Sequence, residues 1–174
     1  MTLNLIHSFA VVLLVAIPIY LSNSFALILG GKTPLDFGKN FFDKRPLFGK
    51  GKTFRGTIAG IVVGSVGALA VSVFLPSFTT AISANYFHYG FLLAIGAMLG
   101  DIVGSFIKRR INLPRGESVL LLDQLDFVAG GILLGSVLFT PDVWQIAFLA
   151  VLTLLKHKLA NVIAFNARLK KVPW

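Results

Sequence analysis

The stretch TIAGIVVGSVGALAVSVFL, residues 57–75, contains 19 residues and not one charged side chain. A membrane core about 30 Å thick requires roughly 20 predominantly apolar residues for one helical crossing. The stretch therefore predicts a membrane-spanning helix. Within it, Gly60, Gly64 and Gly67 recur at spacings of four and three residues, which places small residues on one face and favours close packing against another helix.

Apolar stretches of this kind recur along the whole chain. The same length criterion predicts five spans: Leu5–Leu29, Thr57–Leu75, Phe87–Ile107, Leu120–Phe139 and Val143–Phe165. With 174 residues, 56% of them hydrophobic, and a mean hydropathy of +0.83, the chain has no room for a second, soluble domain. We therefore predict an all-α polytopic membrane protein with about five transmembrane helices and a single integral-membrane domain over residues 1–174.

Basic residues occupy alternate connections between the predicted spans. Loop one, residues 30–56, carries seven: Lys32, Lys39, Lys44, Arg45, Lys50, Lys52 and Arg55. Loop three, residues 105–118, and the C-terminal tail carry most of the others, whereas the N-terminus and residues 76–86 have none. Because Lys and Arg remain on the cytoplasmic side of membrane proteins, we predict an outside N-terminus, a cytoplasmic C-terminus and cytoplasmic loops one and three.

Charge and cysteine content restrict the chemistry. The absence of cysteine excludes disulfides, thiolate nucleophiles and zinc–thiolate sites. Sixteen Lys and Arg against seven Asp and Glu give a formal charge of +9, which we attribute to topology and to an anionic substrate or anionic lipids. We expect no nucleic-acid partner.

Three aspartates lie inside the predicted spans at similar depth. Asp123 and Asp126 are three residues apart and share one helix face. Asp101 lies seven residues before Lys108, about 10 Å below the cytoplasmic surface at 1.5 Å per residue. Acids inside a membrane are costly and normally face the bundle interior with a partner. Because a hard divalent cation is such a partner, we predict that Asp101, Asp123 and Asp126 bind Mg²⁺.

A lysine at the same depth leaves alternatives open. Lys156 could extend to the cytoplasmic interface. Alternatively, Asp101 could form a structural ion pair with Lys156 or with an arginine. His157 follows Lys156 and points about 100° away on a helix. We expect none of the three histidines to act in catalysis.

The end of loop one, PLFGKGKTFRG at residues 46–56, resembles a phosphate-binding loop only in part. A Walker A motif requires glycine where Pro46 stands and follows a strand, so we reject a P-loop fold. Glycines nevertheless let backbone N–H groups approach an anion, and a helix N-terminus favours phosphate. We predict a phosphate site that comprises Lys50, Lys52, Thr53 and Arg55, with Arg115 in loop three as a further anion contact.

Longer motifs carry a resemblance to a known family. GDIVGSFIKRRINLPRGESVLLLDQLDFVAGG, residues 100–131, together with TPLDFGKN and RPLFGKGKTFRGTIAG in loop one, resembles the archaeal CDP-archaeol synthases. The resemblance covers essentially the whole chain. Those proteins are integral-membrane, CTP-dependent cytidylyltransferases related to bacterial CDP-diacylglycerol synthases. The bacterial form has His-Gly-Gly before the aspartates and Asp-Arg-x-Asp in place of Asp-Gln-Leu-Asp, so the archaeal branch is favoured.

The resemblance implies an activity and roles for particular residues. The wider cytidylyltransferase signature has a Ser-x-x-Lys-Arg element, which corresponds here to Ser105, Lys108 and Arg109. Its Asp-x-x-Asp element corresponds to Asp123 and Asp126. The resemblance implies Mg²⁺-dependent transfer of CMP from CTP to 2,3-bis-O-(geranylgeranyl)-sn-glycerol 1-phosphate, with Asp123, Asp126, Lys108 and Arg109 in catalysis. CTP, this isoprenoid ether-lipid phosphate and membrane lipids are then the partners, and the active site of this cell-membrane protein faces the cytoplasm.

Two other functions and one question of assembly stay open. A CTP-dependent lipid kinase would instead transfer the γ-phosphate, and a small ion or metabolite transporter would use the acids for transport. Clustering of the three aspartates near the cytoplasmic side favours a one-sided cavity over a pathway through the membrane. The glycine face of residues 57–75 packs either inside one bundle or between two chains, so a homodimer is open.

Overall fold

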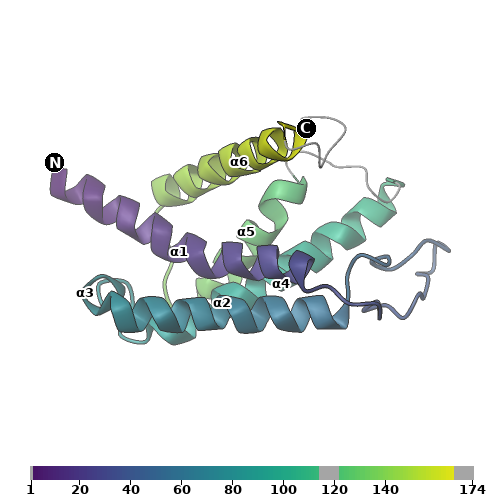
Figure 1. Ribbon diagram of the computed structural model, residues 1–174, viewed down its shortest axis with the longest axis horizontal. Coiled ribbons are helices and arrows are strands. Elements are labelled where there is room, and N and C mark those ends of the chain that lie inside the picture. Colours follow the sequence, from purple (N-terminus) through teal and green to yellow (C-terminus); the bar gives the residue numbers. More distant parts are fainter. Residues whose placement is uncertain (1, 114–121, 167–174) are drawn as a thin grey trace.

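The computed structural model describes residues 2–113 and 122–166. All regular elements in these two ranges are helices: α1 (Thr2–Ile28), α2 (Phe54–Phe74), α3 (Pro76–Thr79), α4 (Tyr86–Arg110), α5 (Leu122–Gly135) and α6 (Val143–Asn166). Helices α1, α2, α4 and α5 form the main bundle, and α6 packs mainly against α1 and α5 (Figure 1). Loop one extends from one end of this bundle.

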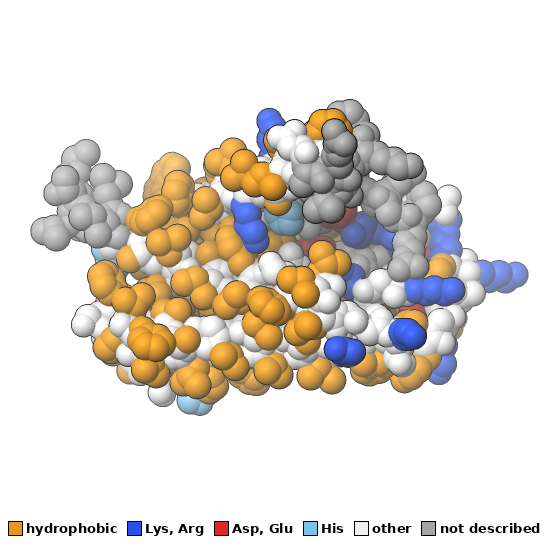
Figure 2. Space-filling model, viewed as in Figure 1, with side chains coloured by type: hydrophobic (Ala, Val, Ile, Leu, Met, Phe, Trp, Pro, Cys, Tyr) orange, Lys and Arg blue, Asp and Glu red, His pale blue; other side chains and the backbone are white. Residues whose placement is uncertain are grey.

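Four of the helices are long and apolar enough to cross a membrane: His7–Ile28, Phe54–Phe74, Tyr86–Arg110 and Val143–Ile163. These agree with four of the predicted spans, and the chain is an all-α membrane protein. Hydrophobic side chains cover the helices, whereas Lys and Arg gather toward the end that loop one forms (Figure 2).

The fifth predicted span, Leu120–Phe139, is corrected by the structure. Helix α5 is described from Leu122 and ends at Gly135, four residues before the predicted end at Phe139, and the first two residues of the predicted span lie outside the described residues. Residues 136–138 turn instead of continuing the helix. Short helix α3 was not expected either. It begins at Pro76, whose fixed backbone angle suits the first position of a helix.

Glycines bring the helices of the bundle close together. Gly56, Gly60 and Gly64 are buried on α2. A methyl group added at Gly60 would lie 2.7 Å from the Ser22 carbonyl oxygen on α1 and 2.7 Å from Met98 Sδ on α4. The glycine face therefore packs inside the bundle of one chain, and a homodimer through another surface stays a prediction.

Helices α4 and α5 meet through glycines as well, which leads to a stability prediction. A methyl group at Gly100 would overlap the Asp126 carbonyl oxygen and lie 3.0 Å from the Gly130 Cα atom, both backbone atoms of α5. Overpacking costs about 1–3 kcal/mol. We expect Gly100→Ala to lower the thermal unfolding midpoint in detergent by several degrees, at about 2–4 °C per kcal/mol for this size.

A matched control for this prediction is Gly30→Ala. At Gly30 the nearest atoms would lie 3.4 and 3.5 Å from the added methyl group, an ordinary contact distance. The Gly30 variant should therefore unfold close to the wild-type midpoint. If Gly100→Ala unfolds at the wild-type temperature as well, the contact between α4 and α5 is not as close as described.

Candidate active site

Asp36 organises the folded part of loop one. Its side chain is only 4% exposed, and its carboxylate accepts hydrogen bonds from the N–H groups of Gly38 at 2.9 Å, Phe48 at 3.0 Å and Gly49 at 2.8 Å. Burial by itself would raise the pKa of Asp36, but these three hydrogen bonds outweigh it and hold the pKa below its ordinary value. The carboxylate therefore stays ionised and holds residues 48 and 49 against residue 36.

Arg110 fastens loop one to the end of α4. Its guanidinium carbon lies 4.9 and 4.8 Å from the centroids of the Phe41 and Phe106 rings, which also contact each other. It also forms an ion pair with Asp43 at 3.0 Å and donates a hydrogen bond to the Pro46 carbonyl oxygen at 2.5 Å. Cation–π contacts and a charge-assisted hydrogen bond together hold the loop in one position. From the sequence, Arg110 is one of the basic residues of loop three, and its spacing predicts none of these contacts.

A cavity of about 530 Å³ lies between loop one and the end of α4, and we call it the loop-one cavity. Its lining includes Ser105 and four of the predicted basic residues: Lys50, Lys52, Lys108 and Arg109. The structure thus brings two sequence motifs together that lie more than 50 residues apart. Four cations around one open space, with glycine backbone beside them, form a site suited to a polyphosphate.

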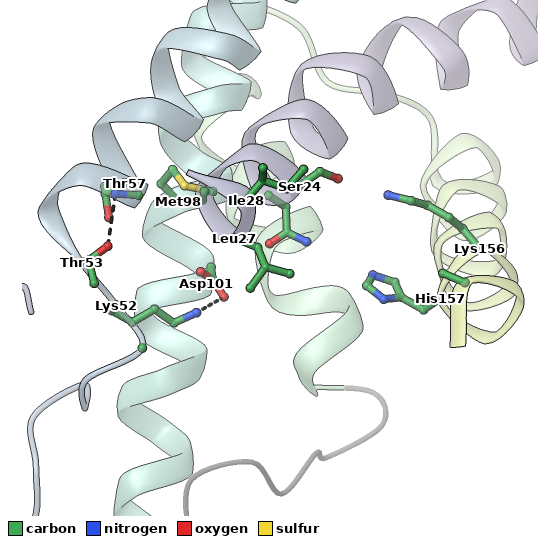
Figure 3. Close-up of a pocket in the computed structure, with 15 residues that line it drawn as sticks. Ser24, Leu27, Ile28, Lys52, Thr53, Thr57, Met98, Asp101, Lys156 and His157 are labelled. Atoms are coloured by element: carbon green, nitrogen blue, oxygen red, sulfur yellow. Dashed lines mark hydrogen bonds and ion pairs between the residues drawn. The ribbon is translucent and has the colours of Figure 1, made fainter. Parts of the chain in front are cut away.

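A second cavity of about 380 Å³ lies between the adjoining ends of α1 and α2 and the facing side of α6, and we call it the α1–α6 cavity (Figure 3). Lys52 and Asp101 line one wall, and Lys156 and His157 project from α6 on the other. Lys156 and His157 are consecutive residues on α6, and both line this cavity. Gly51 and Lys52 line both cavities, so the two cavities are neighbours on either side of these residues.

The three predicted aspartates lie near these cavities but have different partners. Asp101 accepts a hydrogen bond from Lys52 Nζ at 2.5 Å, and Asp123 forms an ion pair with Lys108. The alternative that Lys156 is the partner of Asp101 is therefore wrong. Asp126 accepts a hydrogen bond from its neighbour Phe127 N–H through Oδ1, whereas its buried Oδ2 has no hydrogen-bond partner among residues 2–113 and 122–166.

The predicted metal ligands were tested against this arrangement. Within residues 2–113 and 122–166, no three Asp, Glu, His or Cys side chains lie close enough together to hold a metal ion. Two of the three predicted carboxylates form ion pairs with lysines instead. Asp126 Oδ2 fits a cation nonetheless, because a buried carboxylate oxygen without a donor is costly. The side chain lies directly against Gly104, where any larger residue would overlap it. Coordination by Asp101, Asp123 and Asp126 stays a prediction.

Three other predicted residues are not gathered in this way. Thr53 is the N-cap of α2, and its hydroxyl oxygen accepts hydrogen bonds from the N–H groups of Gly56 at 3.2 Å and Gly31 at 3.0 Å. It lines the α1–α6 cavity, but its hydroxyl oxygen serves the fold. Arg55 is exposed, packs over Gly31 and lines neither cavity. Arg115 lies outside the described residues.

Known proteins are similar to this chain over most of its length. The family model for CarS-like CDP-archaeol synthase matches residues 2–174. The CDP-archaeol synthase of Pyrococcus abyssi is 42% identical, over 91% of this chain and 94% of its own. That of Methanopyrus kandleri is 44% identical, over 91% and 89%. A solved structure of an intramembrane enzyme for archaeal membrane lipid biosynthesis has a TM-score of 0.78 at 31% identity, and the match covers 86% of this chain and 91% of that one.

Proposed function

Because the chain belongs to the CDP-archaeol synthase family, we propose that it transfers CMP from CTP to an isoprenoid ether-lipid phosphate. The expected acceptor is 2,3-bis-O-(geranylgeranyl)-sn-glycerol 1-phosphate, and the products are a CDP-lipid and pyrophosphate. One observation supports the proposal: Gly51 and Lys52 line both a basic cavity beside loop one and a second cavity beside α6. Such an arrangement allows a water-soluble nucleotide and a membrane lipid to react.

CTP suits the loop-one cavity. Lys50, Lys108 and Arg109 offer charge-assisted hydrogen bonds to its β- and γ-phosphates, and loop one is held open in one position by Asp36 and Arg110. The α-phosphate then lies near Lys52, between the two cavities. We propose that this side of the protein faces the cytoplasm, where the basic loops belong.

The acceptor suits the α1–α6 cavity, and the chemistry follows. An oxygen of the lipid phosphate forms a bond to the α-phosphorus of CTP, and the bond from that phosphorus to the bridging oxygen of the β-phosphate breaks, so that pyrophosphate leaves. The attacking oxygen is already ionised, so no residue has to remove a proton. The barrier is the repulsion between anions, which Lys52 reduces at the point of attack while Lys108 and Arg109 stabilise the leaving group.

We propose Mg²⁺ as the cofactor, held by Asp126 with Asp101 and Asp123. When bound it would neutralise phosphate charge and polarise the α-phosphate. The chain supports this role by keeping a buried carboxylate oxygen on Asp126 without a donor among its described residues. Two lysines hold the other two carboxylates in place, and the same lysines line the loop-one cavity.

The test uses purified protein in detergent, CTP labelled at the α-phosphorus and the geranylgeranyl lipid phosphate. We expect label to move into the organic phase, transfer to stop when a chelator is added and to resume with Mg²⁺. Transfer of a γ-label instead would identify a lipid kinase and overturn the proposal. If neither label moves in folded protein, the proposal also fails, and flux into proteoliposomes becomes the measurement for a transporter.

A further inference from the structure

Two residues of α6 have no part in the chemistry described so far. Lys156 and His157 project from α6 into the α1–α6 cavity, on the wall that faces Lys52 and Asp101 (Figure 3). Lys158 follows them on the same helix but is exposed and does not line the cavity. A cation and an imidazole thus face Lys52, near which the α-phosphate of CTP is expected.

Neither residue forms an ion pair in the part of the chain that the structure describes, although the Asp123 carboxylate lies near enough to His157 to interact with it electrostatically. The three ion pairs found there leave Lys156 out, and its Nζ atom lies 3.9 Å from the centroid of the Tyr20 ring. Tyr20 is fixed by a hydrogen bond of 2.7 Å between its hydroxyl and Thr153 Oγ1. Nε2 of His157 is buried and has no hydrogen-bond partner. A partly buried ammonium group and an imidazole nitrogen therefore lack an acceptor.

The charge and the rim of the α1–α6 cavity indicate which kind of ligand would bind Lys156 and His157. On the opposite wall, Lys52 forms an ion pair with Asp101, so Lys156 is the lysine without an ion pair among the described lining residues. The rim includes Leu27 and Ile28 of α1, which are 85% and 68% exposed on the apolar surface of the bundle. A ligand that carries an anionic phosphate on a hydrocarbon body matches both features.

We infer that Lys156 and His157 bind the phosphate of the acceptor lipid and hold it opposite Lys52. The inference rests on the proposed function, which it extends by assigning a phosphate subsite to α6. The phosphates of CTP offer the same chemistry, but the loop-one cavity that suits them is lined by neither residue. From Lys156 the lipid phosphate would face Lys52 across a single cavity, as attack on the α-phosphate requires.

The experiment compares Lys156→Met with Lys158→Met, which removes the same charge from the exposed side of the same helix. We expect Lys156→Met to raise the KM for the lipid phosphate about 10- to 100-fold, as loss of a charge-assisted hydrogen bond predicts, and to leave the KM for CTP within about twofold. Lys156→Arg should restore most of the affinity, and His157→Phe should raise the same KM. Lys158→Met should behave as wild type.

Binding measured without turnover separates the two proposals. Titration of the lipid phosphate into detergent-solubilised protein, with no CTP present, should show the same loss of affinity in Lys156→Met. An unchanged KM and unchanged binding for the lipid phosphate would overturn the inference even if wild-type protein transfers CMP. A rise in the KM for CTP alone would assign the residues to the nucleotide and overturn it as well. If wild-type protein transfers nothing, the proposed function fails, and the binding titration still decides the subsite.

Discussion

Asp126→Asn should lower turnover by about 100- to 1,000-fold, the size of effect seen when one preorganised electrostatic group is lost from an active site. The buried Oδ2 atom of Asp126 has no hydrogen-bond partner among the described residues and lies against Gly104. Asparagine keeps the shape but removes the negative charge that a cation would bind. The measurement is the rate of label transfer from CTP at saturating Mg²⁺.

The same variant should be at least as stable as wild type when divalent cations are absent. An unpaired buried charge is costly, so replacing it by a neutral amide removes a cost. We expect the thermal unfolding midpoint in chelator to stay constant or to rise. Asp142→Asn is the matched control, because Asp142 precedes α6 and lines a cavity distant from the predicted site. Full turnover in Asp126→Asn would remove this residue from the active site, and a lowered midpoint would assign it a structural role.

Lys52→Met should have the second large effect, a loss of about 100-fold or more in turnover. Lys52 lines both cavities and pairs with Asp101, so its removal takes a positive charge from both cavities and leaves a carboxylate without its partner. Lys39→Met is the control, because Lys39 lies in the same loop but is exposed and lines neither cavity. The kinetic constants for CTP and for lipid phosphate should be measured for both variants.

A double variant distinguishes two explanations of that loss. If Lys52 serves only to neutralise Asp101, then Lys52→Met combined with Asp101→Asn should regain much of the activity, because no charge is left unpaired. We expect the double variant to stay inactive, since the charge at the point of attack is still missing. Recovery of activity in the double variant would contradict the role proposed for Lys52 in the reaction.

The sequence predicted the membrane helices best where the signal is local. Apolar runs of sufficient length identified α1, α2, α4 and α6. The signal is local because each helix in lipid pairs its own backbone N–H and C=O groups and needs no neighbour to do so. The same criterion overestimated Leu120–Phe139, since hydropathy counts apolar residues and does not detect where a helix ends. Helix α5 ends at Gly135, before the turn that leads to Pro141.

Side-chain partners were harder to predict. Asp36 lies in TPLDFGKN, and an aspartate two residues before a glycine is a recognisable turn signal, yet its hydrogen bonds to Phe48 and Gly49 depend on the fold of loop one. Lys52 and Asp101 are 49 residues apart, and no sequence spacing relates them. Lys156 was considered as the partner of Asp101 because both lie at similar depth, but depth does not determine which helices are neighbours.

By itself the sequence determined that this chain is a bundle of membrane helices with basic connections, that two of its aspartates share one face of a helix, and that its motifs belong to one family of lipid enzymes. These properties depend on composition and on spacing within single segments. Only the tertiary structure decided that Lys52 lines two cavities, that Arg110 holds loop one on α4 and that Lys156 faces Lys52 from α6. Each of these contacts joins segments far apart in the chain, so no local propensity predicts them.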